Sequence, residues 1–259
     1  MWTVPRFMSA GRIPGDDMSF ETVLKAAQNG DPDAQVAMGY LFFKGDGVGQ
    51  DRREAARWFG LAADQGNAEA LCNLGYMRAH GSGIRLDLEM AMDLYRRSAE
   101  LGYARAMFNL GFMYTDVAGI EQDWQKGYEW YSKAAEAGST MGLYRVGVMQ
   151  LEGRGIDRDP AKAMETFTKC FDAGYSKAGY RLGLMYLNGD GVPKSADRAA
   201  KFMVKAADMG SEDAMCELGK MSLSGEGMVR SDNNARKWLT KAAARGSEEA
   251  KQILEGMKQ

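Results

Sequence analysis

The feature that most constrains this chain is a 36-residue period, which runs through nearly all of its 259 residues. The unit is clearest at Leu182–Glu217, where Leu182-Gly183 is followed by Gly189-Asp190-Gly191 and by a closing Gly210. Shifting this unit by 36 residues in either direction aligns it with another copy. A fixed period of this size indicates a solenoid, in which each repeat packs mainly on its neighbours.

Six full copies follow one another without insertion or deletion, and their positions set the expected domain organisation. We predict a single solenoid over residues 19–257, with a half-repeat at 19–32, six repeats over about 33–248, and a C-terminal capping helix at 248–257. Residues 1–18 contain prolines and glycines and are expected to form a flexible leader, with Met18 as an alternative start. The register rests on an apolar-Gly pair that recurs at Met38-Gly39, Leu74-Gly75, Leu110-Gly111, Val146-Gly147, Leu182-Gly183 and Leu218-Gly219.

Each copy is expected to form two helices joined by a glycine turn, which makes the fold class all-α. A glycine inside a helix costs about 1 kcal/mol relative to alanine, so the repeated helical glycine indicates close approach of the partner helix. The Gly-x-Gly turn suits a left-handed C-cap. The third copy has Val117 at the first position of this turn, which predicts a strained or rerouted loop because β-branched residues resist positive φ. The second helix starts at a capping residue: Asp51, Asp87, Asp123, Asp159, Ser195 or Ser231.

The repeated pattern Leu-Gly-x-x-Tyr-x-x-Gly-x-Gly-Val…Asp-x-x-x-Ala-x-x-Trp…Ala-Ala-x-x-Gly resembles the SEL-one-like repeat, a relative of the tetratricopeptide repeat. The resemblance covers about residues 19–257. It implies a right-handed α-solenoid of helix-turn-helix repeats and a role as a scaffold, adaptor or regulator that binds other proteins. Some bacterial members carry a disulfide in each repeat, and this chain lacks those cysteine pairs.

Charge and cysteine usage narrow the partners and the compartment. A net charge of −2 does not indicate electrostatic binding to nucleic acid or to an anionic membrane. No apolar run reaches the length that a membrane-spanning helix needs. The three cysteines are Cys72, Cys170 and Cys216; Cys72 and Cys216 occupy one repeat position four units apart, too far for a disulfide in a solenoid. Free thiols and the lack of a secretory signal favour the cytoplasm, with a processed secreted chain as the alternative.

The sequence contains no convincing motif for catalysis, for metal binding or for cofactor binding, so we expect a non-enzymatic protein. A dinucleotide fingerprint needs a strand before its glycines, whereas a helix precedes every Gly-x-Gly turn here. His80 is the only histidine and stands at a helix end, where a cap or surface role is favoured over catalysis. The aspartates are accounted for by helix capping.

The candidate binding residues are those that vary at fixed positions of the first helix, which lines the concave groove in the tetratricopeptide fold. Asn73, Asn109, Arg145 and Arg181 form one row across four repeats, similar to the carboxylate clamp of peptide-binding tetratricopeptide domains, although Met141 departs from it. The partner would be a protein or peptide, with an acidic or C-terminal carboxylate group. The full candidate set is Asn73, Tyr76, Arg105, Phe108, Asn109, Phe112, Tyr144, Arg145, Lys177, Tyr180 and Arg181.

Other interpretations stay open. The candidate residues could be ordinary solvated side chains, or could form salt bridges within the array to Glu69, Asp213 or Glu217. An adaptor or regulator is the first functional hypothesis. The alternative is a bacterial immunity or effector-associated protein that neutralises a toxin by direct binding, and the third is an enzyme with an unrecognised site.

Overall fold

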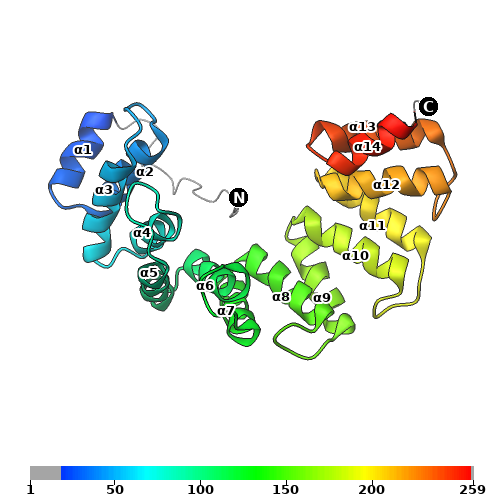
Figure 1. The fold of residues 1–259 in the computed structure, drawn as a ribbon, viewed down its shortest axis with the longest axis horizontal. Coiled ribbons are helices and arrows are strands. Elements are labelled where there is room, and N and C mark those ends of the chain that lie inside the picture. Colours follow the sequence, from blue (N-terminus) through cyan, green and yellow to red (C-terminus); the bar gives the residue numbers. More distant parts are fainter. Residues whose placement is uncertain (1–18, 258–259) are drawn as a thin grey trace. The chain divides into compact units, whose positions relative to one another are not determined.

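The computed structural model describes residues 19–257, which form fourteen α-helices and no strand (Figure 1). The leader expected at residues 1–18 lies outside the described residues. The helices are α1 (Phe20–Gln28), α2 (Pro32–Lys44), α3 (Arg52–Asp64), α4 (Ala68–His80), α5 (Leu88–Glu100), α6 (Ala104–Asp116), α7 (Trp124–Glu136), α8 (Thr140–Glu152), α9 (Pro160–Asp172), α10 (Ser176–Asn188), α11 (Ala196–Asp208), α12 (Glu212–Ser224), α13 (Asp232–Ala244) and α14 (Glu248–Gly256).

The helices follow the 36-residue register throughout this range. We call α2, α4, α6, α8, α10 and α12 the first-type helices, and α3, α5, α7, α9, α11 and α13 the second-type helices. Every one of them has 13 residues, and helices of one type start 36 residues apart, as at Pro32 and Ala68. The shorter α1 and α14 supply the half-repeat and the capping helix. The predicted all-α solenoid of helix-turn-helix repeats is confirmed.

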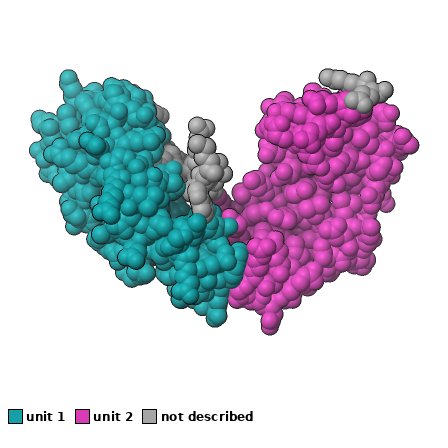
Figure 2. Space-filling model, viewed as in Figure 1, with its two compact units in different colours: residues 1–139 teal, residues 140–259 magenta. Residues whose placement is uncertain are grey.

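The helices gather into two compact units, shown in different colours in Figure 2: α1–α7 before residue 140, and α8–α14 from residue 140 onward. Unit 1 contains the half-repeat and the first three repeats, and unit 2 contains the last three repeats and α14. In each unit a first-type helix packs on the second-type helix that follows it, and that helix packs on the next repeat. The prediction of one uninterrupted solenoid across the two units stays a prediction.

Glycine positions explain how closely the two helix types pack. A Cβ atom on Gly111 of α6 would lie 2.7 Å from the ring of Tyr131 on α7, and one on Gly147 of α8 would lie 2.8 Å from the ring of Phe167 on α9. The expected C-caps are also present: Gly81 and Gly189 end their helices in the left-handed conformation. Val117 instead ends α6 at φ −94° and ψ 120°, so the predicted rerouting of this loop is confirmed.

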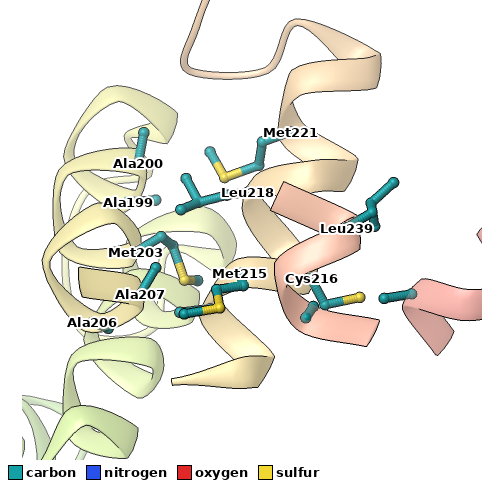
Figure 3. Packing of buried hydrophobic residues seen from close by; sticks show 13 residues of the cluster. Ala199, Ala200, Met203, Ala206, Ala207, Met215, Cys216, Leu218, Met221 and Leu239 are labelled. Atoms are coloured by element: carbon teal, nitrogen blue, oxygen red, sulfur yellow. The ribbon is translucent and has the colours of Figure 1, made fainter. Parts of the chain in front are cut away.

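Second-type helices begin at the predicted capping residues, and their alanines allow neighbouring helices to pack closely. The Asp87 side chain accepts a hydrogen bond from the Met90 backbone N–H at 2.9 Å. In unit 2, Met203 and the alanines of α11 share one buried cluster with Leu218 of α12 and Leu239 of α13; Met203, Leu218 and Leu239 are fully buried (Figure 3). Burial of such apolar side chains contributes about 1.5–3 kcal/mol each. None of the helices within residues 19–257 is long and apolar enough to cross a membrane.

Candidate functional site

In unit 1 the candidate residues of α4 belong to a polar network between repeats. Asn73 is only 2% exposed, and its Nδ2 atom donates to the Tyr40 hydroxyl at 2.9 Å. That hydroxyl in turn donates to Oε1 of Glu69 at 2.6 Å. Burial, followed by the hydrogen bond to Glu69, raises the pKa of Tyr40 above its usual range. Asn73 was expected on an open surface; because it is buried and bonded, it instead holds α4 against α2.

The candidate residues of α6 divide between the network, the core and a pocket. Arg105 is half-buried, is hydrogen-bonded to Tyr40, and holds its guanidinium 5.6 Å from the ring centre of Tyr103. Phe108 is 5% exposed and packs on Tyr131 of α7, so it is a core residue rather than an open contact. Asn109 and Phe112 are half-buried and line one pocket at the end of α6.

Tyr76 of α4 lies next to the only histidine of the chain. Its ring stacks on His80 with the ring centres 4.1 Å apart. Nδ1 of His80 lies 2.7 Å from the Tyr76 carbonyl oxygen, one helical turn earlier. Since a carbonyl oxygen can only accept, Nδ1 carries the proton in this pair. His80 also lines the pocket that contains Asn109 and Phe112.

In unit 2 the candidate residues bring cations and tyrosines together on α8 and α10. Nε of Arg181 donates to the Tyr144 hydroxyl at 3.2 Å, which links two successive first-type helices. The Tyr144 ring packs on Tyr175, with centres 5.1 Å apart. Arg145 and Tyr180 are half-buried and Lys177 is exposed. Burial, together with the Glu217 and Asp213 carboxylates, raises the pKa of Tyr180. This surface therefore offers arginine, lysine and aromatic rings from adjacent repeats.

The last repeat of unit 2 contains an ion-pair network around Lys220. Lys220 of α12 lies 2.7 Å from a Glu217 oxygen and 3.0 Å from a Glu249 oxygen on α14. Glu217 and Asp213 of α12 also lie close enough to Tyr180 of α10 to act on its phenol. Glu217 thus forms a salt bridge within the array, which was one of the alternatives left open by the sequence. Its partner is Lys220 rather than one of the candidate binding residues.

Two contacts recur at fixed sequence offsets and were not anticipated. Tyr40 reaches Glu69 and Lys220 reaches Glu249, each across 29 residues. Asn109 reaches Cys72 at 3.6 Å and Arg181 reaches Tyr144, each across 37 residues. In the first contact, the residue after the helical glycine pairs with the second residue of the next first-type helix, Glu69, or of α14, Glu249. Finding this pairing requires placing one repeat on the next.

Thiols and possible metal ligands add no reactive centre to the described residues. Within residues 19–257 no group of three or more histidine, cysteine, aspartate or glutamate side chains could hold a metal ion. Cys72, Cys170 and Cys216 are free and buried. Burial raises the pKa of Cys72 and of Cys170 to about 12, which keeps both thiols protonated and unreactive at neutral pH.

Comparison with known proteins gives one family and several similar folds. Six segments match the model of the Sel1 repeat, at residues 32–67, 68–103, 104–139, 140–169, 176–211 and 212–247. A Sel1 repeat protein from Oxalobacter formigenes is 30% identical with a TM-score of 0.76, and the alignment covers 87% of this chain and 88% of that one. No curated protein sequence matches at a significant level.

Two further solved structures are similar. A protective antigen of uropathogenic Escherichia coli with an SLR fold is 28% identical with a TM-score of 0.78; the alignment covers 90% of this chain and spans only half the length of that protein. An immunity protein from Pseudomonas aeruginosa is 18% identical with a TM-score of 0.53, covering 85% of this chain and 83% of that one. At this identity the second likeness concerns the fold alone.

Proposed function

The chain belongs to the Sel1 repeat family, whose members are generally protein-interaction scaffolds, and from this premise we propose that it is a non-enzymatic adaptor or regulator. It binds a partner protein or peptide through its first-type helices. The observation that carries the proposal is the cluster of Tyr144, Arg145, Lys177, Tyr180 and Arg181 on α8 and α10, which we call the cationic face. Arg145, Lys177 and Arg181 stand at repeat positions whose charge changes from copy to copy, whereas the helical glycine is the same in all six copies. Tyr144 also packs on Phe167 of α9, so only part of its ring is available to a partner.

The chemistry of the cationic face suits an acidic group, and a C-terminal carboxylate in particular. Arginine binds carboxylates through two parallel hydrogen bonds, and such charge-assisted bonds are stronger than neutral ones. The bond from Arg181 to Tyr144 fixes one guanidinium in advance, which lowers the entropy lost on binding. The carboxylates of Glu217 and Asp213 near Tyr180 would repel the rest of an acidic chain, so they would direct it toward α8.

The proposal is tested with a displayed library of peptides that have free C-termini, selected on the full chain. We expect Arg145→Ala with Arg181→Ala to weaken binding of the selected peptides more than tenfold, since each charged hydrogen bond contributes about 1.5–3 kcal/mol. Helicity by circular dichroism should be unchanged. The matched control is Lys169→Ala with Lys205→Ala, which removes the same charge from exposed positions of α9 and α11 in the same unit. Equal affinity of the double-arginine variant and the wild type would contradict the assignment of the cationic face as the binding site.

Two further measurements separate charge from geometry. Arg181→Lys keeps the charge but loses the planar fork, so it should retain only part of the affinity. Amidation of the peptide C-terminus distinguishes a terminal carboxylate from an acidic side chain. Affinity lost on amidation supports the carboxylate, whereas affinity kept on amidation and lost on the double-arginine change assigns the face to acidic side chains.

A second candidate function is neutralisation of a toxin by direct binding. It is supported by the similarity in fold to a Pseudomonas aeruginosa immunity protein. A toxin gene beside the gene for this chain, with growth rescued by co-expression, would favour it over the adaptor role. For location we propose the cytoplasm, because three free, buried cysteines suit a reducing compartment.

A further inference from the structure

Unit 1 contains a pocket of about 370 Å³ that lies between α4, α5 and α6. Its walls include Leu86, Leu88, Phe112 and Met113, and His80 and Asn109 stand among them. The volume is in the range of pockets that hold a small ligand or a large side chain. Leu86 is 55% exposed at its edge, which leaves an apolar rim in contact with solvent.

The pocket exists because the third repeat departs from the others at its turn. In other repeats, such as the second and the sixth, the second turn glycine lies against the start of the preceding second-type helix: a Cβ on Gly83 would collide with the Arg52 backbone, and one on Gly227 with the Ala196 backbone. Gly119 is the equivalent residue, and a Cβ there would meet only the tip of the Leu88 side chain, at 3.2 Å. With Val117 extended, the loop stands away from the start of α5 and leaves the space open.

The pocket combines apolar walls with one well-placed acceptor. The His80 ring is fixed twice, by stacking on Tyr76 and by the contact between Nδ1 and the Tyr76 carbonyl oxygen. Because Nδ1 carries the proton in that contact, Nε2 of the neutral ring is an acceptor. Asn109 is already hydrogen-bonded to Cys72 and Tyr95. It therefore lines the pocket without offering a ligand its amide donor. The site therefore suits a flat apolar group that carries a single N–H or O–H.

We propose that this pocket receives one tryptophan or tyrosine side chain of the partner protein, with its N–H or O–H bonded to Nε2 of His80. The inference rests on the proposed function, since it assigns the partner an aromatic anchor on unit 1. Tryptophan and tyrosine combine a large apolar body with a polar tip, and they are the usual anchors in buried interface pockets. Asn109 and Phe112 belong both to the pocket and to the first-type surface where varying residues were expected, so pocket and surface are continuous.

His80 makes the test direct, because the full chain contains a single histidine and selective labelling therefore gives one imidazole signal. N-acetyl-tryptophanamide is titrated at fixed neutral pH while the Nε2 resonance is followed. We expect a saturable shift. The 1-methyl analogue, which lacks the indole N–H, should bind roughly threefold to tenfold more weakly, as the loss of one neutral hydrogen bond predicts. No saturable shift, or equal affinity for the two compounds, overturns the assignment of His80.

Filling the pocket tests its location without touching the core. Ala118→Leu, on the exposed loop that borders the pocket, should weaken the titration roughly tenfold by occupying the space. Ala137→Leu, at an exposed site after α7, is the matched control and should leave it unchanged. Peptides selected on the full chain should contain a tryptophan or tyrosine. Changing that peptide residue to alanine should weaken binding at least as much as the Ala118→Leu change in the protein.

The outcomes separate this inference from the proposed function. If peptide binding depends on Arg145 and Arg181 but not on Ala118→Leu, the cationic face stands and the pocket assignment fails. If the tryptophan titration succeeds while the double-arginine variant binds normally, the pocket stands and the cationic face fails. A small aromatic molecule that co-purifies with the chain in equal amount, detected by native mass spectrometry, would overturn the side-chain occupant.

Discussion

Gly111 lies in α6 at a point where the ring of Tyr131 leaves no room for a side chain. That ring is 1% exposed, and its hydroxyl lies 3.1 Å from Oγ1 of Thr115, so it cannot easily move aside. Replacing a helical glycine by alanine stabilises a protein only where the surroundings have room for the methyl group. The glycine at this repeat position was predicted to reflect a steric need, and the Tyr131 ring supplies the reason.

We predict that Gly111→Ala lowers the free energy of unfolding by about 1–3 kcal/mol, since overpacking outweighs the gain in helix propensity. Gly60 in α3 provides the opposite case, because nothing lies within 4 Å of a Cβ built there. Gly60→Ala should raise the free energy of unfolding by about 0.5–1 kcal/mol. Chemical denaturation of both variants measures the two changes. A stabilising Gly111→Ala would contradict the close-approach argument.

The second-type helices depend on their first residue as much as on their packing. At the start of α7, the Asp123 carboxylate accepts from the Lys126 backbone N–H at 2.9 Å and pairs with the Lys126 ammonium at 3.0 Å. The backbone hydrogen bond, then the side-chain bond to Lys126, lowers the pKa of Asp123. A carboxyl group whose folded pKa is depressed stabilises the protein above its unfolded pKa, and the contribution is lost as pH falls through the folded pKa.

We therefore predict that Asp123→Ala reduces stability at pH 7 and that its deficit against the wild type shrinks in acid, below about pH 4. Glu129→Ala is the control, because Glu129 is exposed on the same helix but lies outside its first turn. Thermal unfolding at several pH values compares the three proteins. A deficit that stays constant from pH 7 to pH 3 would show that the cap does not act through its charge.

Helix boundaries could be predicted from the sequence, because caps and turn glycines are local signals repeated six times. The site could be predicted only in outline. Asn73 occupies the same repeat position as Arg181, and Phe108 the same position as Tyr180. Both are nevertheless buried, because Tyr40 of the preceding repeat covers Asn73 and Tyr131 on the second helix of the same repeat covers Phe108. The pocket beside His80 depends on the path of one loop, and Val117 indicated only that this path would change.

At the scale of the whole molecule, buried acidic groups in both units couple stability to alkaline pH. Burial raises the pKa of Cys72 in unit 1 and of Cys170 in unit 2 from 9.0 to about 12. In the unfolded chain these thiols lose their protons near pH 9, whereas the folded protein retains them. The unfolded state then binds fewer protons, so the free energy of unfolding falls as pH rises, and it keeps falling until the folded pKa is reached.

We predict that the free energy of unfolding decreases steadily between pH 8 and pH 10.5, approaching about 1.4 kcal/mol per pH unit for each such thiol above its unfolded pKa. Chemical denaturation across this range measures the slope. Cys72→Ala with Cys170→Ala costs stability at every pH but removes both titrations, so its slope should be shallower than that of the wild type. Parallel slopes for the two proteins would mean that other groups, such as the buried Tyr95, account for the alkaline loss, because burial raises the pKa of this phenol as well.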